Sequence, residues 1–438
     1  MRRLTCVLVV VLLVAAAGAA TLNAHREMLP NGIVLLVSER PDLPIVVARA
    51  DVRAGSAFDP PDNPGLANLT AELLTRGTAR RTGPQLDEAI EFVGGSLGAD
   101  AGRDGVTISL AILRKDLKLG LGLLAEVLLE PSFAPAELER KVKSIQAAIQ
   151  RSDDEPDTVA GRTLAALLYP GHPYGHPVAG TEASVGKLTR AQVIEFYRRH
   201  YRPDSTILAV VGDVKRDEIV KELSARLARW ARPREPAPRV SPAPAAPPVQ
   251  ARTVARDLTQ VTVYLGRPAV RHDHPDYYPL MVASYILGEG SASRLYTKVR
   301  EEAGLAYSVG SYLSSGRYGA SLVVSLQTRT EGVGEAVQLV KAELGRMGKG
   351  PVSDEELGLA KAYLTGSFPL RMDTSPEMAS MLVSVEEWAL GLDYPDRFRE
   401  RVEQVTTADI LRVARTYLDP ATFSIVSVGK INAPGKSP

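Results

Sequence analysis

Apolar and polar positions along the chain follow two periods, and the changes from one period to the other outline a series of strands and helices. Short runs of branched apolar residues with alternating polar positions predict strands, and apolar residues at every third or fourth position predict helices. The first part of the chain has strand patterns over 32–37, 45–53 and 106–110, and helix patterns over 65–76, 86–93, 115–129 and 135–151. The second part has strand patterns over 261–265 and 322–326, and helix patterns over 278–287, 293–301, 332–346 and 354–367. Short strands with helices grouped to one side predict an α+β fold built on mixed or antiparallel sheets.

A segment rich in proline and alanine separates these two parts. Residues 235–248 read E-P-A-P-R-V-S-P-A-P-A-A-P-P. Prolines lack a backbone donor and favour extended polyproline conformations, so this composition predicts a semi-stiff linker. We place the linker at 235–253, between an N-terminal domain over 21–234 and a C-terminal domain over 254–438.

The two parts end in the same way, which indicates a duplication. In each, a threonine that can cap a helix precedes an amphipathic helical pattern, and a proline, a strand and a closing glycine follow. The corresponding residues share one offset of 217 positions: Ala191 with Ala408, Pro203 with Pro420, and Gly212 with Gly429. Agreement of cap, helix phase, proline and glycine in one register predicts two homologous domains.

The N-terminus has the pattern of a signal peptide over residues 1–20. Arg2 and Arg3 precede an apolar run over 4–17, and small residues follow at 17–19. A single-span membrane anchor is the alternative, but the run is shorter than the ~20 apolar residues that a span needs. We therefore expect export to the periplasm or cell envelope of a bacterium, with no stable membrane span after signal cleavage.

Composition and charge narrow the class of partners. Apolar residues make up 45% and charged residues 24% of the chain, as in soluble globular proteins. Removal of residues 1–20 leaves 50 basic and 51 acidic residues, a net charge of about −1, and takes away the only cysteine, Cys6. A near-neutral chain of this kind gives no reason to expect nucleic acid as a partner.

Three short patterns suggest other chemistry but lack the context that it needs. Residues 94–98 match the G-x-S-x-G motif of α/β-hydrolases, yet here a helix enters and a strand leaves, which reverses the order of that motif. His172 and His176 flank Pro-Tyr-Gly, and the neighbouring prolines predict a structural turn rather than metal-ligand spacing. His272 and His274 lie among charged residues, which favours a solvated loop.

The helix expected over 65–78 carries a more specific signal. It has Gly65-x-Ala67 at its start and Gly77-Thr78 at its end. This frame resembles the zinc helix of the pitrilysin/insulinase metallopeptidases, a family that includes the mitochondrial processing peptidases. In that family the helix carries His-x-x-Glu-His, in which two imidazoles on one helix face bind zinc and the Glu acts as base on the metal-bound water.

The metal-binding residues of that frame are absent. By the resemblance, the family's His, Glu and His fall on Asn68, Ala71 and Glu72, and a third ligand, a Glu on a later helix, falls on Ala147 or Ala148. A catalytic zinc needs about three protein ligands, so we expect no metal and no other cofactor in this chain. A weak cation site at Asn68 and Glu72 is the less favoured alternative. The intact frame predicts that the helix itself is preserved.

A second element of the family is intact. Residues 299–309 read V-R-E-E-A-G-L-A-Y-S-V, with Arg300 and Tyr307 seven positions apart. They resemble the family's Arg/Tyr element, whose side chains by the resemblance hold substrate beside the metal. A guanidinium and a phenol can both donate to a peptide carbonyl, which orients it and stabilises developing negative charge. The alternative is that Arg300 pairs with a neighbouring Glu and Tyr307 packs on a strand.

The resemblance covers nearly the whole chain after the signal and implies a division of labour. Some bacterial relatives use two chains, one with the zinc motif and one with the Arg/Tyr pair. We therefore expect the non-zinc, substrate-binding subunit of a heterodimeric zinc metalloendopeptidase acting on peptides, inactive alone and completed by a homologous subunit that carries the zinc. Two alternatives stay open: an inert structural subunit, like the core proteins of the respiratory cytochrome complex, and a stand-alone peptide-binding protein.

Overall fold

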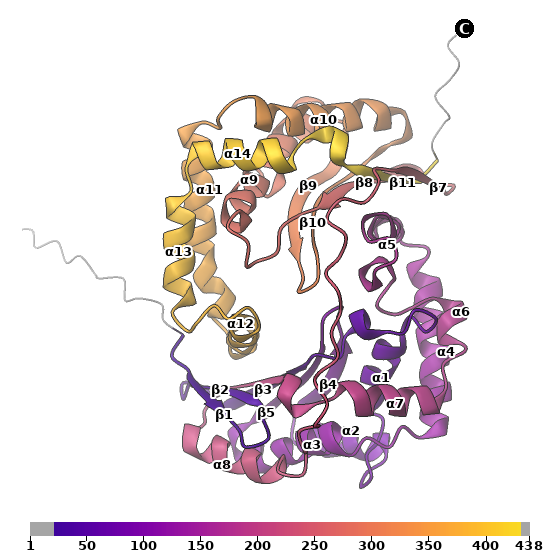
Figure 1. Cartoon of the computed structure of the whole chain (residues 1–438), viewed down its shortest axis with the longest axis vertical. Helices are drawn as coiled ribbons and strands as arrows, with labels where there is room; N and C mark the ends of the chain where they lie inside the picture. Colours follow the sequence, from indigo (N-terminus) through magenta and orange to yellow (C-terminus); the bar gives the residue numbers. More distant parts are fainter. Residues whose placement is uncertain (1–21, 431–438) are drawn as a thin grey trace, which may run out of the picture.

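A computed structural model describes residues 22–430 of the chain, and these form two halves, each built on one sheet (Figure 1). The expected signal peptide at 1–20 lies outside the described residues. The first half, from β1 to α8, contains β1 (His25–Met28), β2 (Val34–Glu39), β3 (Ile45–Val52), α1 (Leu66–Leu74), α2 (Gly83–Glu91), β4 (Ser96–Ala101), β5 (Val106–Leu113), α3 (Leu117–Leu129), α4 (Pro135–Ser152), α5 (Pro156–Leu168), α6 (Glu182–Val185), α7 (Arg190–His200), β6 (Thr206–Gly212) and α8 (Arg216–Arg226).

The second half, from β7 to β11, follows a segment without helix or strand. It contains β7 (Ala251–Ala255), β8 (Gln260–Pro268), α9 (Tyr277–Gly288), the π-helical turn η5 (Tyr296–Glu302), β9 (Ala306–Ser315), β10 (Ala320–Arg329), α10 (Val333–Lys349), α11 (Asp354–Ser367), α12 (Ser375–Glu387), α13 (Tyr394–Gln404), α14 (Thr407–Tyr417) and β11 (Ser424–Gly429). The α+β class expected from the sequence is confirmed.

The two sheets share one topology. The first has the order β1-β2-β6-β3-β5-β4 and the second the order β7-β11-β8-β10-β9. In each, the last strand of the half pairs in parallel with the first strand of the shared set, β6 with β2 and β11 with β7, and the other pairs are antiparallel. Except for the added edge strand β1, the strands correspond one to one, as a duplication predicts.

The closing glycine of each half is required by its backbone. Gly212 and Gly429 have φ values of 138° and 144°, a region that disfavours residues with a side chain. A Cβ on Gly212 would lie 2.0 Å from the carbonyl oxygen of Ile45, on the neighbouring strand. The shared glycine is therefore explained by a close crossing of strands that both copies contain.

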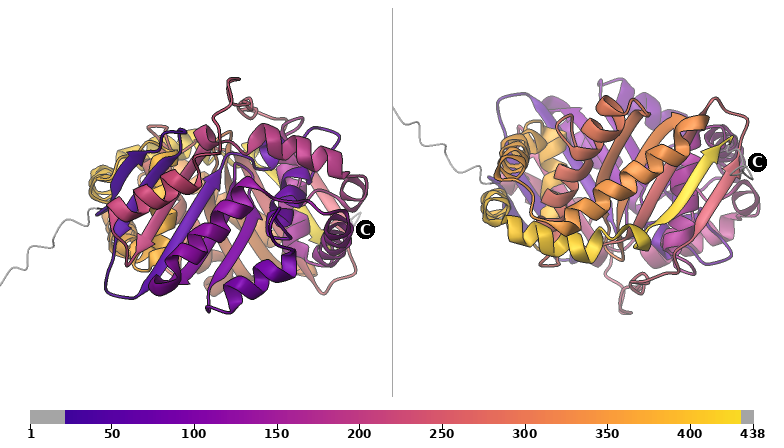
Figure 2. Two further views of the ribbon diagram at one scale, coloured as in Figure 1. Left: turned by 90° about the horizontal axis from the view of Figure 1, so that it is seen from below. Right: turned by 90° about the horizontal axis from the view of Figure 1, so that it is seen from above.

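Each half covers one face of its sheet with its own helices, as expected (Figure 2). The opposite face receives a single helix from the other half, which the periodic pattern did not predict. Helix α5 packs on β8 and β11 of the second sheet, with Val159 and Leu164 in one cluster with Val426. Helix α12 packs on β3 and β6 of the first sheet, where Leu382 joins a cluster with Val211. The halves thus exchange one helix each.

The proline-rich segment is fixed to the body rather than spanning open solvent. His172 Nε2 lies 2.9 Å from the carbonyl oxygen of Ser241, and the amide of Ala243 donates to the carbonyl oxygen of Tyr318 at 2.7 Å. Arg202 donates to the carbonyl oxygen of Glu235 at 2.7 Å. The segment therefore runs as a strap that contacts both halves.

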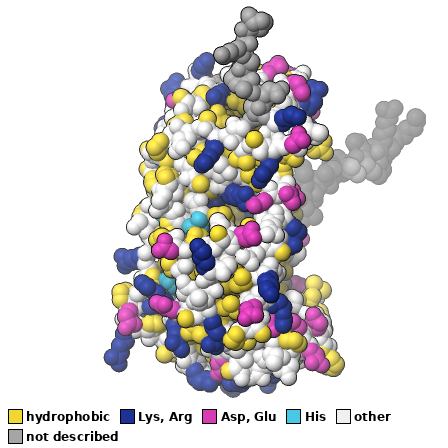
Figure 3. All heavy atoms as spheres, turned by 90° about the vertical axis from the view of Figure 1, so that its right-hand side faces the viewer, with side chains coloured by type: hydrophobic (Ala, Val, Ile, Leu, Met, Phe, Trp, Pro, Cys, Tyr) yellow, Lys and Arg dark blue, Asp and Glu magenta, His cyan; other side chains and the backbone are white. Residues whose placement is uncertain are grey.

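On the face that shows α4, α5 and α6, basic and acidic side chains are intermixed and no single-sign patch covers that side (Figure 3). Among residues 22–430 no helix is both long and apolar enough to cross a membrane.

Two of the helices expected from the sequence need correction. Helix α1 ends at Leu74, because Gly77 and Thr78 form bridges with Thr82 and Pro131. The helix expected over 293–301 is instead the π-helical turn at 296–302.

Candidate functional site

Helix α1 is anchored at its N-terminus by a buried carboxylate. Asp59 accepts hydrogen bonds from the amides of Gly65 at 2.8 Å and Ala67 at 2.7 Å, which satisfies two amides that the first turn leaves free. Burial raises the pKa of Asp59 to about 7, while the two amide bonds act in the opposite direction. Gly65 has φ 95°, and a Cβ there would lie 2.7 Å from the carbonyl oxygen of Ala179. The frame thus depends on Asp59 as well as on the glycine seen in the sequence.

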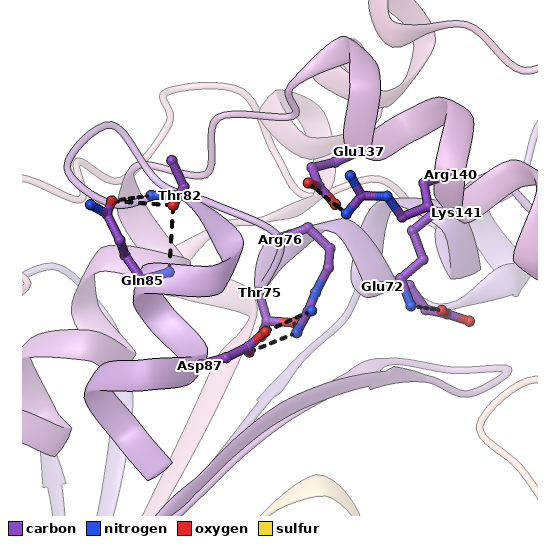
Figure 4. A network of polar contacts seen from close by, with 9 residues as sticks. All are labelled: Glu72, Thr75, Arg76, Thr82, Gln85, Asp87, Glu137, Arg140 and Lys141. Atoms are coloured by element: carbon purple, nitrogen blue, oxygen red, sulfur yellow. Dashed lines mark hydrogen bonds and ion pairs between the residues drawn. The ribbon is translucent and has the colours of Figure 1, made fainter. Parts of the chain in front are cut away.

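The polar residues Asn68 and Glu72 of α1 form a small polar network with Lys141 of α4. Lys141 Nζ lies 2.7 Å from Glu72 Oε2, and both side chains are partly buried (Figure 4). The Asn68 amide donates to the other carboxylate oxygen of Glu72 at 3.4 Å. The carboxylate that could have contributed to a cation site is therefore already neutralised by an ammonium group.

The alanines of the frame lie on the same two helices. Ala71 is fully buried in the first-half core. Ala148 is exposed, whereas Ala147 is partly buried. Seven residues make about two helical turns, so Ala148 shares the α4 face of Lys141, and Ala147 is turned away from it. Of the two candidates for the third-ligand position, Ala148 is the one on the side of Glu72.

These residues do not fit a zinc ion. The methyl groups of Ala71, Ala147 and Ala148 offer no donor atom, and a zinc site needs about three protein ligands from imidazole, thiolate or carboxylate groups. Over residues 22–430 no group of three or more His, Cys, Asp or Glu side chains is placed to hold a metal ion. The donor groups at these positions therefore do not match the family's catalytic metal.

The Arg/Tyr element lies in the second half, where η5 leads into β9 (Figure 1). Leu295 and Val299 are fully buried and fix the turn to the core, so Arg300 is carried on its outer side. The Arg300 guanidinium carbon lies 4.8 Å from the ring centre of Tyr296 and 6.0 Å from that of Tyr307. Both distances are in the range of cation–π contacts, so the two predicted residues are brought together.

A β-bulge directs Tyr307 outward. In the pairing of β9 with β10, Ser308 faces Gln327 and Ala306 faces Thr328, so Tyr307 is the extra residue without an opposite partner. Bulges of this kind redirect a side chain, and Tyr307 is 73% exposed. Tyr307 therefore does not pack on its strand.

The polar groups of this pair are free for an external ligand. Among the described residues the Arg300 side chain forms no ion pair or hydrogen bond, and the neighbouring Glu302 is paired with Lys298 at 2.6 Å instead. No hydrogen bond within 22–430 uses the Tyr307 hydroxyl either. The alternative in which Arg300 is bound to an adjacent glutamate does not describe this geometry. The role of the pair in binding substrate remains a prediction.

The three short patterns set aside above have structural explanations. Helix α2 enters residues 94–98 and β4 leaves them, as expected, so there is no strand–turn–helix nucleophile. In the turn between His172 and His176, the Tyr174 hydroxyl donates to Asp104 and accepts from the amide of Tyr318, which joins the two halves. The expectation of a solvated loop is wrong for His272, which stacks on Trp388 and lies 3.1 Å from the Tyr394 hydroxyl.

Two models of known protein families match the sequence of this chain. A model described as Insulinase (Peptidase family M16) matches residues 34–182, and one described as the Peptidase M16 inactive domain matches residues 187–364. The chain belongs to the insulinase family. The zinc-helix frame on α1 lies within the first match, and the Arg/Tyr element lies within the second.

Individual relatives extend over most of the chain. A Mycobacterium leprae protein named an uncharacterized zinc protease is 30% identical over 372 residues, which is 83% of this chain and 82% of that protein. A Mycobacterium tuberculosis protein with the same description is 29% identical over 411 residues, or 92% of each chain. The zinc in those names refers to those proteins.

Solved structures show the same fold at full length. A peptidase M16 inactive domain from Pseudomonas fluorescens has a TM-score of 0.88 and 27% identity, covering 94% of this chain and 99% of that chain. A protease from Helicobacter pylori has a TM-score of 0.86 at 19% identity, covering 93% and 99%, and shows the fold alone.

Sequence reasoning missed three residues that shape these sites. Tyr296, four positions before Arg300, could have been found from a spacing typical of stacked pairs on a helix. Asp59 precedes Gly65 across a proline-rich turn, a context in which a capping side chain is common. Lys141 carried no local signal, because its partner Glu72 is 69 positions away.

Proposed function

We propose that this chain is the non-zinc, substrate-binding subunit of a heterodimeric zinc metalloendopeptidase that acts on peptides. Its partner is a homologous subunit that carries the zinc motif and supplies the metal. Arg300 and Tyr307 complete the partner's active site by donating to the carbonyl oxygen of the peptide bond to be cleaved. The chain alone is inactive.

The observation that carries this proposal is that the polar groups of the Arg/Tyr element are free to bind a ligand, whereas those at the degenerate zinc positions are not. The polar groups at the degenerate zinc positions are bonded to one another, whereas the Arg300 and Tyr307 side chains are exposed, adjacent and without polar partners among the described residues. An exposed arginine stacked between two tyrosines loses little conformational freedom when a ligand binds, since it is already held in place. A merely structural pair would bury or satisfy these groups.

The test is reconstitution with a zinc-motif partner. The mature chain is expressed with a zinc-motif homologue from the same organism, sought first among the neighbouring genes, and cleavage of a mixed peptide library is measured with and without a chelator. We expect each chain alone to be inactive, the pair to cleave, and the chelator to abolish cleavage. A chain that co-purifies with no zinc-motif protein, and adds no activity to one, would contradict the proposal.

The same complex separates the two alternatives. A structural subunit predicts that Arg300→Ala and Tyr307→Phe leave the partner's activity unchanged. A stand-alone peptide-binding protein predicts that the monomer binds library peptides without any partner, and that reconstitution yields no cleavage.

We further propose that residues 1–20 direct export to the periplasm or cell envelope. The support is the basic, apolar and small-residue order of that segment. Cell fractionation with N-terminal sequencing of the recovered chain tests this. A full-length chain retained in the cytoplasm would contradict it.

A further inference from the structure

A cavity of about 470 Å³ lies in the first half, beside the N-terminal end of α1, and neither Arg300 nor Tyr307 lines it. The loop before α1 with the first residue of that helix, one face of α7, and residues 238–240 of the proline-rich strap surround it. Ligand pockets of proteins have volumes of roughly 300–1,000 Å³, so this cavity is large enough for a ligand. Because Ser241 and Glu235 are hydrogen-bonded to the body on either side, the strap forms a fixed wall of the cavity.

The floor of the cavity is aromatic and uncharged. The His200 ring lies 5.1 Å from that of Phe58 and 4.4 Å from that of Phe196, measured between ring centres. His200 is only 6% exposed, and its Nδ1 has no hydrogen-bond partner among the described residues. Burial, with Arg199 and Arg202 adding to it, lowers the pKa of His200 to about 4, so the imidazole is neutral near pH 7. An apolar or aromatic side chain fits such a floor.

The rim of the cavity has a different character. Arg199 and Arg239 both line it, both are exposed, and neither forms an ion pair within residues 22–430. One acidic residue, Glu195, accompanies them, so the rim carries a net positive charge. The side-chain amide of Asn63 also lies on the rim and has no hydrogen bond among the described residues, so it can donate to and accept from a peptide group.

An apolar floor beside two free arginines and one free amide matches a particular group, the last residue of a peptide. We propose that this cavity binds a peptide C-terminus, with an aromatic or large apolar side chain packed against the floor that Phe58, Phe196 and His200 form. The α-carboxylate lies at Arg199 and Arg239, since guanidinium groups bind carboxylates in bidentate fashion. This site is separate from Arg300 and Tyr307 and does not depend on the proposed peptidase complex.

The experiment uses the mature full chain and a fluorescent pentapeptide, Ala-Ala-Ala-Ala-Phe, with a free C-terminal carboxylate or a C-terminal amide. We expect the free acid to bind about tenfold more tightly than the amide, because the amide lacks the charge that the arginines recognise. Equal binding of the two peptides, or binding of neither, would overturn the proposal. N-acetyl-phenylalanine serves as a third probe, and affinity equal to that of the peptide would show a site for small aromatic acids instead.

Two pairs of variants locate the binding. Asn63→Trp places a large ring in the cavity and is expected to abolish binding, whereas Asp62→Trp, on the exposed side of the same loop, is the matched control. Arg199→Ala with Arg239→Ala is expected to weaken binding of the free acid about threefold to tenfold. Arg198→Ala, an exposed neighbour outside the cavity, is expected to have no effect.

A melting curve of each variant confirms folding, so that loss of binding reports the site. Binding that survives Asn63→Trp in a folded chain would overturn the assignment. Arg300→Ala and Tyr307→Phe test whether the pentapeptide instead occupies the Arg/Tyr element. If they abolish binding, the peptide occupies the Arg/Tyr element and the inference fails, whatever the fate of the proposed peptidase.

Discussion

The degenerate zinc positions and the Arg/Tyr element are both family sites on well-packed frames, but their polar groups are used in opposite ways. On α1 and α4, Asn68, Glu72 and Lys141 satisfy one another. At the start of β9, Arg300 and Tyr307 face outward beside Tyr296 and bond to nothing polar within the described residues. The backbone arrangement of a family site can therefore be present without the residues that perform its chemistry. Polar side chains without partners are better evidence of function than an intact backbone arrangement.

The largest effect is expected from restoring the metal ligands, which tests whether the α1–α4 frame is still shaped for zinc. The variant carries Asn68→His, Glu72→His and Ala148→Glu, with Lys141→Ala so that no ammonium competes for the site. We expect about one zinc per chain with micromolar affinity or better, a gain of about 8 kcal/mol. Metal analysis and titration measure it.

Its control moves the third ligand by one residue. With Ala147→Glu in place of Ala148→Glu, zinc should bind far more weakly, because that side chain leaves the α4 face of Lys141. Equal binding by both variants would contradict the orientation of α4 described above. A folded variant that binds no zinc would mean that the positions of α1 and α4 no longer suit a zinc site, in addition to the loss of the ligand residues.

Arg300→Ala tests the other side of the comparison. In the reconstituted complex we expect kcat/KM to fall roughly 100-fold, because loss of one positioned donor to a developing oxyanion costs about that much. The fall should appear mainly in kcat. Arg329→Ala, an exposed arginine at the end of β10, is the matched control, and a similar loss there would point to a general charge effect.

Asp59→Ala tests how much the α1 frame depends on its cap. At pH 5 we expect the free energy of unfolding to fall by about 1–2 kcal/mol, since two amides of the first turn lose their acceptor. Urea denaturation measures it. Asp59→Asn keeps an acceptor and should lose less.

Asp59 also predicts a pH dependence. Its pKa of about 7 in the folded chain lies above that of an unfolded aspartate, so the native state binds more protons between about pH 4 and 7. The contribution of Asp59 to the free energy of unfolding is therefore fully present below about pH 4 and is lost as the pH rises from there through about 7. Asp59→Asn removes the titrating group, so the stability of that variant should change less over this range. An identical pH profile for the variant and the parent chain would contradict the burial of this carboxyl.

Tyr307→Phe removes only a hydroxyl. We expect about a tenfold fall in kcat/KM of the complex, the value of one hydrogen bond, with the ring still stacked near Arg300. Tyr363→Phe, another exposed tyrosine of the second half, serves as control. No change in either variant would remove the phenol from the mechanism.

Lys141→Ala should have the smallest effect. The ion pair with Glu72 is partly exposed, and such pairs contribute about 0.2–1 kcal/mol. Thermal unfolding in low and high salt measures it, and salt should reduce the difference between the variant and the parent chain. A loss of several kcal/mol would show that the pair, rather than apolar packing, joins α1 to α4.

Local pattern was enough to predict most elements and the frame of α1, because period and capping residues are written in consecutive positions. The offset of 217 residues predicted the common topology for the same reason. Contacts between distant segments were not predictable. Nothing near Glu72 names Lys141 as its partner, and the apolar stripe of α5 does not say which of two similar sheets it covers.

The outward direction of Tyr307 was equally hidden. It depends on a bulge, which arises from the register of β9 against β10 rather than from either strand alone. The stacked position of His272 was missed because its charged neighbours in sequence are not its neighbours in space.

The exchange of α5 and α12 means that neither half is a complete folding unit. A first half expressed alone, ending after α8, would have a first sheet without α12 and an α5 with its apolar side exposed to solvent. Separately expressed halves should therefore aggregate. Proteolytic cleavage of the folded protein within the strap should have the opposite outcome. The two fragments would remain associated, because each sheet would still be covered by a helix of the other fragment. The cleaved protein would elute as a single species in size-exclusion chromatography.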